Sequence, residues 1–149
     1  MKKKIISIPP VYLFACLIMQ FVVPRLFPVM NLIPFPFTLI GLPFLATGIF
    51  FILGAHQSLR KHATPVTFAP STCLIREGVY RHSRNPMYLG FLALLAGLSI
   101  WSGNVLTLFC PVFMFLVLDR MFIPFEEEKM AASFGETYLN YRQSVRRWF

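Results

Sequence analysis

Acidic residues, cysteine and histidine are scarce in this chain of 149 residues. It has 6 Asp and Glu against 14 Lys and Arg, and only 3 His and 3 Cys. Cys16, Cys73 and Cys110 lie far apart, are odd in number and match no metal or redox motif, and the histidines also lack ligand spacing. The sequence therefore predicts no disulfide framework and no metal site.

Charge of either sign is also sparse. Charged residues make up 13% of the chain and hydrophobic residues 56%, and the mean hydropathy is +0.64. A soluble domain of this length could not bury so much apolar surface, so the composition indicates a polytopic membrane protein whose partner is the lipid bilayer. The net charge of +8 is typical of topology signals and of contacts with lipid headgroups, and we expect no nucleic-acid partner.

The apolar runs predict a single all-α domain, residues 1–149, with about four transmembrane helices. The expected spans are about residues 5–23, 37–55, 86–101 and 105–122. The first resembles a signal peptide with a lipoprotein-like cleavage site at Cys16, but its apolar run continues past that residue, which favours a retained span. Four prolines predict a loop over residues 24–36, and residues 56–85 are expected to form a structured polar loop.

The third and fourth runs are joined by residues 102–104 alone, which predicts an antiparallel helical hairpin. Both are shorter than the roughly 20 residues that a bilayer core requires. The fourth helix either thins the membrane locally or continues through Asp119 and Arg120 towards Phe125. An ionisable pair at that depth is either functional or a pair of interfacial anchors, and the sequence leaves both interpretations open.

The C-terminal part of the chain is more polar. Three glutamates at 126–128 follow Pro124 in what is predicted to be the first turn of a helix, where acidic side chains are favoured. Further on, apolar and aromatic residues recur at spacings of four and three, which places them on one helical face: Phe134, Tyr138, Tyr141, Val145 and Trp148. We expect a C-terminal amphipathic helix that lies at the membrane interface.

The positions of the basic residues predict the topology. All Lys and Arg except Arg25 fall before the first span, within residues 56–85 or from Arg120 onward. Four spans with both termini in the cytoplasm satisfy the positive-inside rule. The polar motifs would then share the cytoplasmic face.

The change from a basic loop to an apolar helix at Asn85 and Pro86 is the most informative local feature. Proline disfavours helical geometry in the residue before it and suits the first turn of a helix, so α-helix is expected from Pro86 onward. Free N–H groups at this start, together with Arg81 and Arg84, would suit a carboxylate or another anionic group. The alternative is that these residues are ordinary interfacial anchors.

Several motifs, in order and spacing, resemble the isoprenylcysteine carboxyl methyltransferase family, which is related to the phospholipid N-methyltransferases. The resemblance covers residues 64–149 and rests on these stretches: 78–80 (Gly-Val-Tyr), 84–90 (Arg-Asn-Pro-Met-Tyr-Leu-Gly), 126–127 (Glu-Glu), 134–141 (Phe-Gly-Glu-x-Tyr-x-x-Tyr) and 145–148 (Val-Arg-Arg-Trp). It implies an integral membrane enzyme that uses S-adenosylmethionine without a soluble Rossmann fold.

The resemblance also implies the residues of a cofactor site. The matching positions, with the neighbouring glutamate of the pair included, are Leu74, Ile75, Tyr80, Asn85, Pro86, Met87, Tyr88, Glu126 and Glu127. Asn85 stands where the eukaryotic enzymes carry a histidine, and asparagine cannot take a proton at neutral pH. The family's substrate-side arginine has no match in register, because Phe122 occupies that position, and Arg120 is the nearest candidate for a catalytic role.

The chemistry of these residues suits S-adenosylmethionine. Arg84 and the helix-start N–H groups would hold its carboxylate, Glu126 its ammonium, and Tyr80 or Tyr88 its ring or sulfonium. We therefore expect methyl transfer to a lipophilic acceptor: an isoprenylcysteine-like carboxylate, a phospholipid amine, a thiol or a quinone-like lipid. Two alternatives are a membrane reductase related to the sterol reductases, which would use NADPH, and a non-catalytic lipid-binding subunit.

Overall fold

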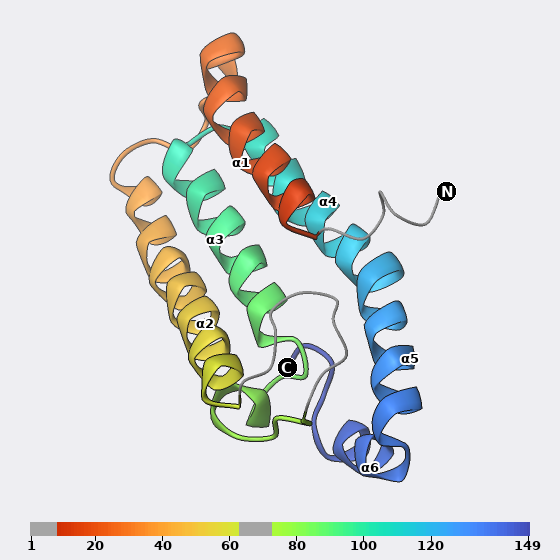
Figure 1. Ribbon diagram of the computed structural model, residues 1–149. Helices are drawn as coiled ribbons and strands as arrows, with labels where there is room; N and C mark the ends of the chain where they lie inside the picture. Colours follow the sequence, from red (N-terminus) through yellow and green to blue (C-terminus); the bar gives the residue numbers. More distant parts are fainter. Residues whose placement is uncertain (1–8, 63–72) are drawn as a thin grey trace.

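The computed structural model describes residues 9–62 and 73–149 as a bundle of helices (Figure 1). The α-helices are α1 (Pro9–Leu26), α2 (Gly41–Lys61), α3 (Pro86–Ser102), α4 (Phe109–Val117), α5 (Ile123–Phe134) and α6 (Glu136–Ser144). Short 3₁₀ turns precede three of them: η2 (Phe37–Ile40), η3 (Gly78–Arg81) and η4 (Val105–Leu108). Extended pairing among the described residues is limited to one bridge between Asn31 and Asn104, so the predicted all-α fold is confirmed.

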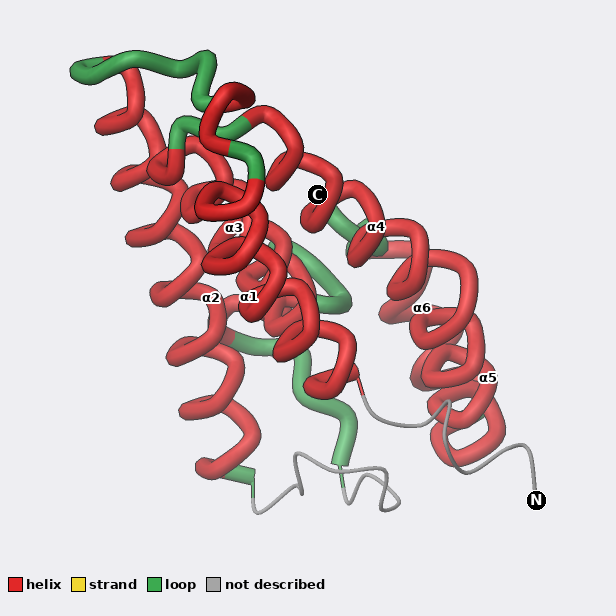
Figure 2. Tube along the Cα trace, turned by 90° about the horizontal axis from the view of Figure 1, so that it is seen from above, coloured by secondary structure: helices red, strands yellow, loops and turns green. Residues whose placement is uncertain are grey.

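The protein is a polytopic membrane protein, as predicted. Pro9–Leu26, Phe37–Lys61 and Val105–Phe134 are long and apolar enough to cross a membrane, and Pro86–Ser102 is a shorter apolar helix. These four lengths run alternately up and down in Figure 1, where the end of α2, the start of α3, the end of α5 and α6 lie at the lower end. Seen from above, α2 lies on one side, α4, α5 and α6 lie on the other, and α1 and α3 are between them (Figure 2).

The observed bounds refine the predicted spans. Residues 5–8 of the first span lie outside the described residues, and α1 continues to Leu26, so the prediction of a loop from residue 24 was wrong at its start. Pro24 is tolerated there because the helix ends two residues later and few backbone bonds are lost. A 3₁₀ turn, Pro28–Met30, lies within the rest of that loop. The second span extends six residues beyond residue 55, to Lys61, and the third matches its predicted range closely.

The fourth span continues beyond Asp119 and Arg120, which decides between the two alternatives left by the sequence. A π-helical turn, η5 (Leu118–Phe122), joins α4 to α5, so one continuous helical length runs to Phe134. The helix predicted to begin at Pro124 is α5, which begins one residue earlier, at Ile123, and continues the fourth span without a break. Proline removes a backbone donor and crowds the carbonyl four residues earlier, and the wider π turn immediately before it accommodates this disruption without ending the helix.

The C-terminal helix is shorter than predicted. Helix α6 ends at Ser144, and Val145 is extended, with φ −126° and ψ 133°. Tyr138 and Tyr141 form its buried face as expected. Phe134 belongs to α5, from which α6 is separated by Gly135 with φ 52°, and Val145 and Trp148 lie beyond the end of α6, so the prediction of one helix from Phe134 through Trp148 was wrong. Residues 145–149, which we call the strap, fold back onto the bundle because their backbone and side chains bond to the start of α3 and to α5.

Four glycines hold α2 and α3 at close approach. A Cβ atom at Gly48 would lie 2.8 Å from the backbone N of Leu94 and 2.9 Å from the carbonyl O of Gly90. Gly41 of α2 and Gly97 of α3 are in the same kind of backbone contact farther along the two helices. Small residues let membrane helices approach until their backbones touch. Because α3 carries the motif residues at its lower end, this contact fixes their position relative to α2.

We expect Gly48→Ala to destabilise the protein by about 1–2 kcal/mol, because the added methyl meets backbone atoms that cannot rotate away. Thermal unfolding in detergent micelles, followed by far-UV circular dichroism, measures the effect. Ala46→Leu is the control, since Ala46 is exposed on α2. Equal stability of both variants and the wild type would contradict the close contact.

Candidate functional site

The residues singled out by the motifs gather at the lower end of the bundle in Figure 1, where η3, the start of α3, α5, α6 and the strap meet. They form two adjoining polar groups. One is the tyrosine–glutamate cluster, composed of Tyr80, Tyr88 and Glu126. The other is the charge network, composed of Arg84, Asp119, Glu127 and Arg147.

The tyrosine–glutamate cluster joins α3 to α5. Pro86 begins α3 with no side-chain cap, and this places Tyr88 in the first turn, where its hydroxyl donates to Oε1 of Glu126 at 2.5 Å. Tyr80 lies close enough to interact electrostatically with both Tyr88 and Glu126. The cluster therefore combines one carboxylate with two nearby tyrosines.

Helix α6 fixes Tyr80 from the other side. The hydroxyl of Tyr141 donates to the carbonyl O of Tyr80 at 2.7 Å. Burial raises the pKa of Tyr141 to about 12, although the nearby Arg84 opposes the shift, and burial followed by the nearby Tyr141 and Glu126 raises the pKa of Tyr80. Both phenols are therefore protonated at neutral pH, and Tyr141 stays a hydrogen-bond donor.

The charge network is buried beside this cluster. Nη1 of Arg84 lies 2.9 Å from Oε1 of Glu127, and each side chain is only 9% exposed. These two atoms form a close charge contact without hydrogen-bond alignment, and Nε of Arg84 is also buried with no hydrogen-bond partner among the described residues. Glu127 therefore neutralises Arg84 but leaves part of the donor capacity of its guanidinium unused.

Arg147 of the strap completes the charge network. Its guanidinium lies 3.0 Å from Oε2 of Glu127 and 3.3 Å from Oδ1 of Asp119, which sits on the π turn. These contacts, chiefly the hydrogen bond to Glu127, raise the pKa of Arg147, so it remains charged. Nε1 of Trp148 also donates to Oδ1 of Asp119, at 3.0 Å.

The strap backbone is bonded to the start of α3. The carbonyl O of Arg147 accepts hydrogen bonds from Oγ of Ser83 at 3.2 Å and from Nδ2 of Asn85 at 3.1 Å. The backbone N–H of Arg84 donates to the carbonyl O of Arg146 at 3.1 Å. Asn85 thus holds the strap in place.

The structure brings only part of the predicted site together. Tyr80, Tyr88 and Glu126 form one cluster, whereas Arg84 and Glu127 pair with each other next to it. Arg120 is 78% exposed and lies 3.8 Å from Asp119, whose nearer partners are Arg147 and Trp148. The contact between Asp119 and Arg120, which the sequence leaves open as a functional pair or as interfacial anchors, is therefore the weakest of the Asp119 contacts.

The remaining predicted residues surround these groups. Pro86 is buried, and Met87 packs against two groups of buried apolar residues, one that includes Leu95 and one that includes Phe51. Leu74 is half-buried and Ile75 buried, immediately before Arg76, whose guanidinium donates to the carbonyl O of Thr137 in α6.

Sequence reasoning assigned no role to Asp119 in a charge network, to Ser83 or to the strap. The only sequence signal for the role of the strap was the Arg-Arg-Trp motif at residues 146–148, and this motif is equally typical of a membrane interface.

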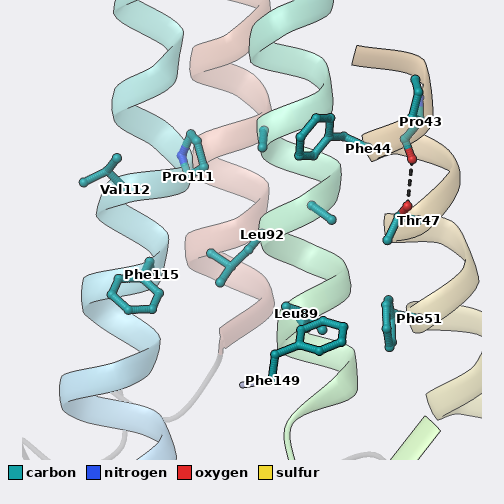
Figure 3. A pocket seen from close by; sticks show the side chains of 12 residues that line it. Pro43, Phe44, Thr47, Phe51, Leu89, Leu92, Pro111, Val112, Phe115 and Phe149 are labelled. Atoms are coloured by element: carbon teal, nitrogen blue, oxygen red, sulfur yellow. Dashed lines mark hydrogen bonds between the residues drawn. The ribbon is translucent and has the colours of Figure 1, made fainter. Parts of the chain in front are cut away.

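An apolar groove of about 570 Å³ adjoins the cluster, between α2, α3 and α4 (Figure 3). All its lining side chains are uncharged, and the hydroxyl of Thr47 among them is engaged with the carbonyl O of Pro43 at 2.8 Å. Leu89 lines the groove and directly follows Tyr88 of the cluster. Within residues 9–62 and 73–149, no group of His, Cys, Asp or Glu could hold a metal ion.

These features define a multi-pass membrane protein in which a polar cluster meets an apolar groove at one end of the bundle. Over residues 37–137, the chain matches the phospholipid methyltransferase family. The chain belongs to this family, whose members are membrane methyltransferases dependent on S-adenosylmethionine.

Individual relatives agree with this assignment. The chain is 34% identical over 91 residues to Protein-S-isoprenylcysteine O-methyltransferase A of Arabidopsis thaliana, an alignment that covers 56% of this chain and 43% of the relative. It is 34% identical over 76 residues to the Schizosaccharomyces pombe protein-S-isoprenylcysteine O-methyltransferase, covering 48% of this chain and 30% of the relative. The chain thus spans less than half the length of these relatives.

A further relative, an uncharacterized protein of Haemophilus influenzae, is 37% identical over 62 residues, which are 42% of this chain and 98% of that protein. We found no significant match to a solved structure.

Proposed function

We propose that this protein is an S-adenosylmethionine-dependent methyltransferase whose acceptor carries a long hydrocarbon chain. The observation that carries the proposal is the junction at the start of α3. There, consecutive residues face different environments: Tyr88 bonds to Glu126, and Leu89 lines the apolar groove. A polar cofactor and a lipophilic acceptor would thus meet at one turn of helix.

The residues of the cluster fit the cofactor. Glu126 supplies a carboxylate for an ammonium group, and the rings of Tyr80 and Tyr88 suit a sulfonium or an adenine. The uncapped start of α3 and the unpartnered Nε of Arg84 suit a carboxylate. When bound, S-adenosylmethionine would supply an electrophilic methyl group, which an acceptor carboxylate or thiolate takes with an electron pair of its own and without releasing a proton.

The protein's contribution would be binding, orientation and exclusion of water. The charge network and the strap hold the start of α3 against α5, so the groups that face the cofactor and the acceptor are preorganised. Arg120, the residue that we predicted to act on the acceptor, has an exposed side chain, and its role remains a prediction. We also propose that this end of the bundle faces the cytoplasm, since Arg25 alone among the described basic residues lies at the opposite end.

The decisive experiment uses the purified protein in detergent micelles with radiolabelled S-adenosylmethionine. We expect saturable cofactor binding and methyl transfer to one class of acceptor among a farnesylated cysteine, a phosphatidylethanolamine, a long-chain thiol and a quinol. For that class, kcat/KM for the complete acceptor should be at least roughly tenfold higher than kcat/KM for its head group alone. The reason is that the binding energy of the hydrocarbon chain in the groove helps to position the reacting group.

Absence of saturable binding by folded protein would overturn the proposal. Oxidation of NADPH in the same preparation would point instead to the reductase alternative.

A further inference from the structure

The strap carries two aromatic residues that contact opposite walls of the groove. The ring of Phe149 lies 6.0 Å from that of Phe51 on α2, at 88°, and the ring of Trp148 lies 5.3 Å from that of Phe115 on α4, at 38°. Phe51 and Phe115 both line the groove, as does Phe149 itself. The strap therefore bridges α2 and α4 across one end of the groove.

This end is the one nearest the polar cluster. Figure 3 shows Phe149 beside Leu89 and facing Phe51, near the start of α3, whereas Pro43 and Pro111 line the groove farther along the helices. Since Tyr88 precedes Leu89, an acceptor chain lying in the groove would pass this aromatic pair immediately before its reactive group reached the cluster.

Phe149 is placed by the strap rather than by its own packing. Its side chain is 67% exposed, in contrast to 8% for Phe51. The backbone two residues earlier is fixed by Ser83 and Asn85, and the Arg147 and Trp148 side chains are held by Asp119. The Phe149 ring therefore contributes little to the core, but the strap holds it at a fixed position in the groove. Such a ring is suited to discriminate between the acceptor molecules that lie in the groove.

We propose that Phe149 and Phe51 form a neck between the groove and the polar cluster, that Phe149 determines which acceptors pass it, and that Asp119 is a positioning residue for the strap. The inference rests on the proposed function for its acceptor. The segment of the acceptor next to the reactive group must fit between the two rings, so slim linear segments pass and bulky ring-bearing ones are rejected. The uncharged groove lining suits only the hydrocarbon part of such a molecule.

Binding can be tested without catalysis through Trp148. In a Trp101→Phe background Trp148 is the one remaining tryptophan, and bromine quenches its fluorescence on contact. The probes are long-chain alkyl carboxylates brominated near the carboxylate, one linear and one with a cyclohexyl ring at that position. We expect the wild type to bind the linear probe more tightly, and Phe149→Ala to reduce this preference roughly tenfold.

Further variants keep the test decisive. Phe149→Tyr adds a hydroxyl to the ring, which narrows the neck without introducing a second tryptophan, and should increase the preference for the linear probe. Asp119→Asn removes one of the two carboxylates that contact Arg147 and should shift the preference in the same direction as Phe149→Ala. Phe109→Ala is the matched control, because Phe109 is 72% exposed and lies outside the groove, and it should bind both probes as the wild type does.

The same ratio is then measured for methyl transfer, as kcat/KM for linear against ring-bearing acceptors of the active class. If quenching responds to Phe149 substitutions but no acceptor is methylated, the neck stands and the proposed function fails. If methyl transfer is observed and neither ratio changes in Phe149→Ala and Phe149→Tyr, the neck is overturned and the proposed function stands.

Discussion

Glu127→Gln should lower the free energy of unfolding by about 3–5 kcal/mol, since it leaves Arg84 as a buried charge without a counterion. Both side chains are 9% exposed, and Glu127 contacts two guanidinium groups, those of Arg84 and Arg147. Loss of its charge affects α3, α5 and the strap together. Denaturant unfolding in detergent micelles, followed by circular dichroism, measures the change.

Two controls separate charge burial from other effects. Glu128→Gln should be nearly neutral, because Glu128 is exposed and surface charges contribute little. The double variant Arg84→Met with Glu127→Leu should recover most of the lost stability, because it removes both buried charges and leaves Arg147 its contact with Asp119. A double variant as unstable as the single one would contradict the assignment of the effect to an unpaired charge.

The buried pair explains why only part of the site could be predicted from the sequence. Residues 126–128 are three glutamates in succession, and no composition or spacing rule distinguishes them. In the structure they lie on different sides of α5: Glu126 bonds to Tyr88, Glu127 joins the charge network and Glu128 is exposed. The rotation of α5 that sets these positions follows the π turn at Leu118–Phe122, and π turns have no reliable sequence signature.

The helices themselves were predictable because bilayer length and apolar composition constrain them strongly. Pro86 marked the start of α3 correctly, since it comes after a polar loop and its fixed φ suits the first helical turn. The strap could not be predicted, because its local sequence pattern points to a helix and long-range contacts override that pattern. Val145 and Trp148 continue the helical spacing of Tyr138 and Tyr141, and only long-range bonds to Asn85 and Asp119 explain why the chain is extended there.

These observations assign different roles to adjacent glutamates. Glu127 is committed to internal charge pairing, so its substitution should affect stability more than cofactor affinity in the protein that remains folded. Glu126 accepts a hydrogen bond from the Tyr88 hydroxyl, and a carboxylate with remaining acceptor capacity can still bind a ligand ammonium. The two positions therefore allow the fold and the proposed site to be tested separately.

Glu126→Gln should lower the affinity for S-adenosylmethionine roughly ten- to hundredfold at constant salt, with little change in stability. The substitution preserves shape and can still accept a hydrogen bond from Tyr88, but it removes a charge-assisted bond to the ammonium, which is worth about 1.5–3 kcal/mol. Isothermal titration calorimetry on the detergent-purified protein measures the affinity. Tyr88→Phe should weaken binding less, because the ring remains and only the hydroxyl that orients Glu126 is lost.

Glu128→Gln is the matched control for Glu126→Gln, since it makes the same chemical change two residues along the same helix. It should leave cofactor affinity within about twofold of the wild type, because an exposed carboxylate is screened by water and salt. If Glu126→Gln and Glu128→Gln weaken binding equally, the three acids act only as a diffuse negative charge. The cofactor site would then lie elsewhere than between Tyr80, Tyr88 and Glu126.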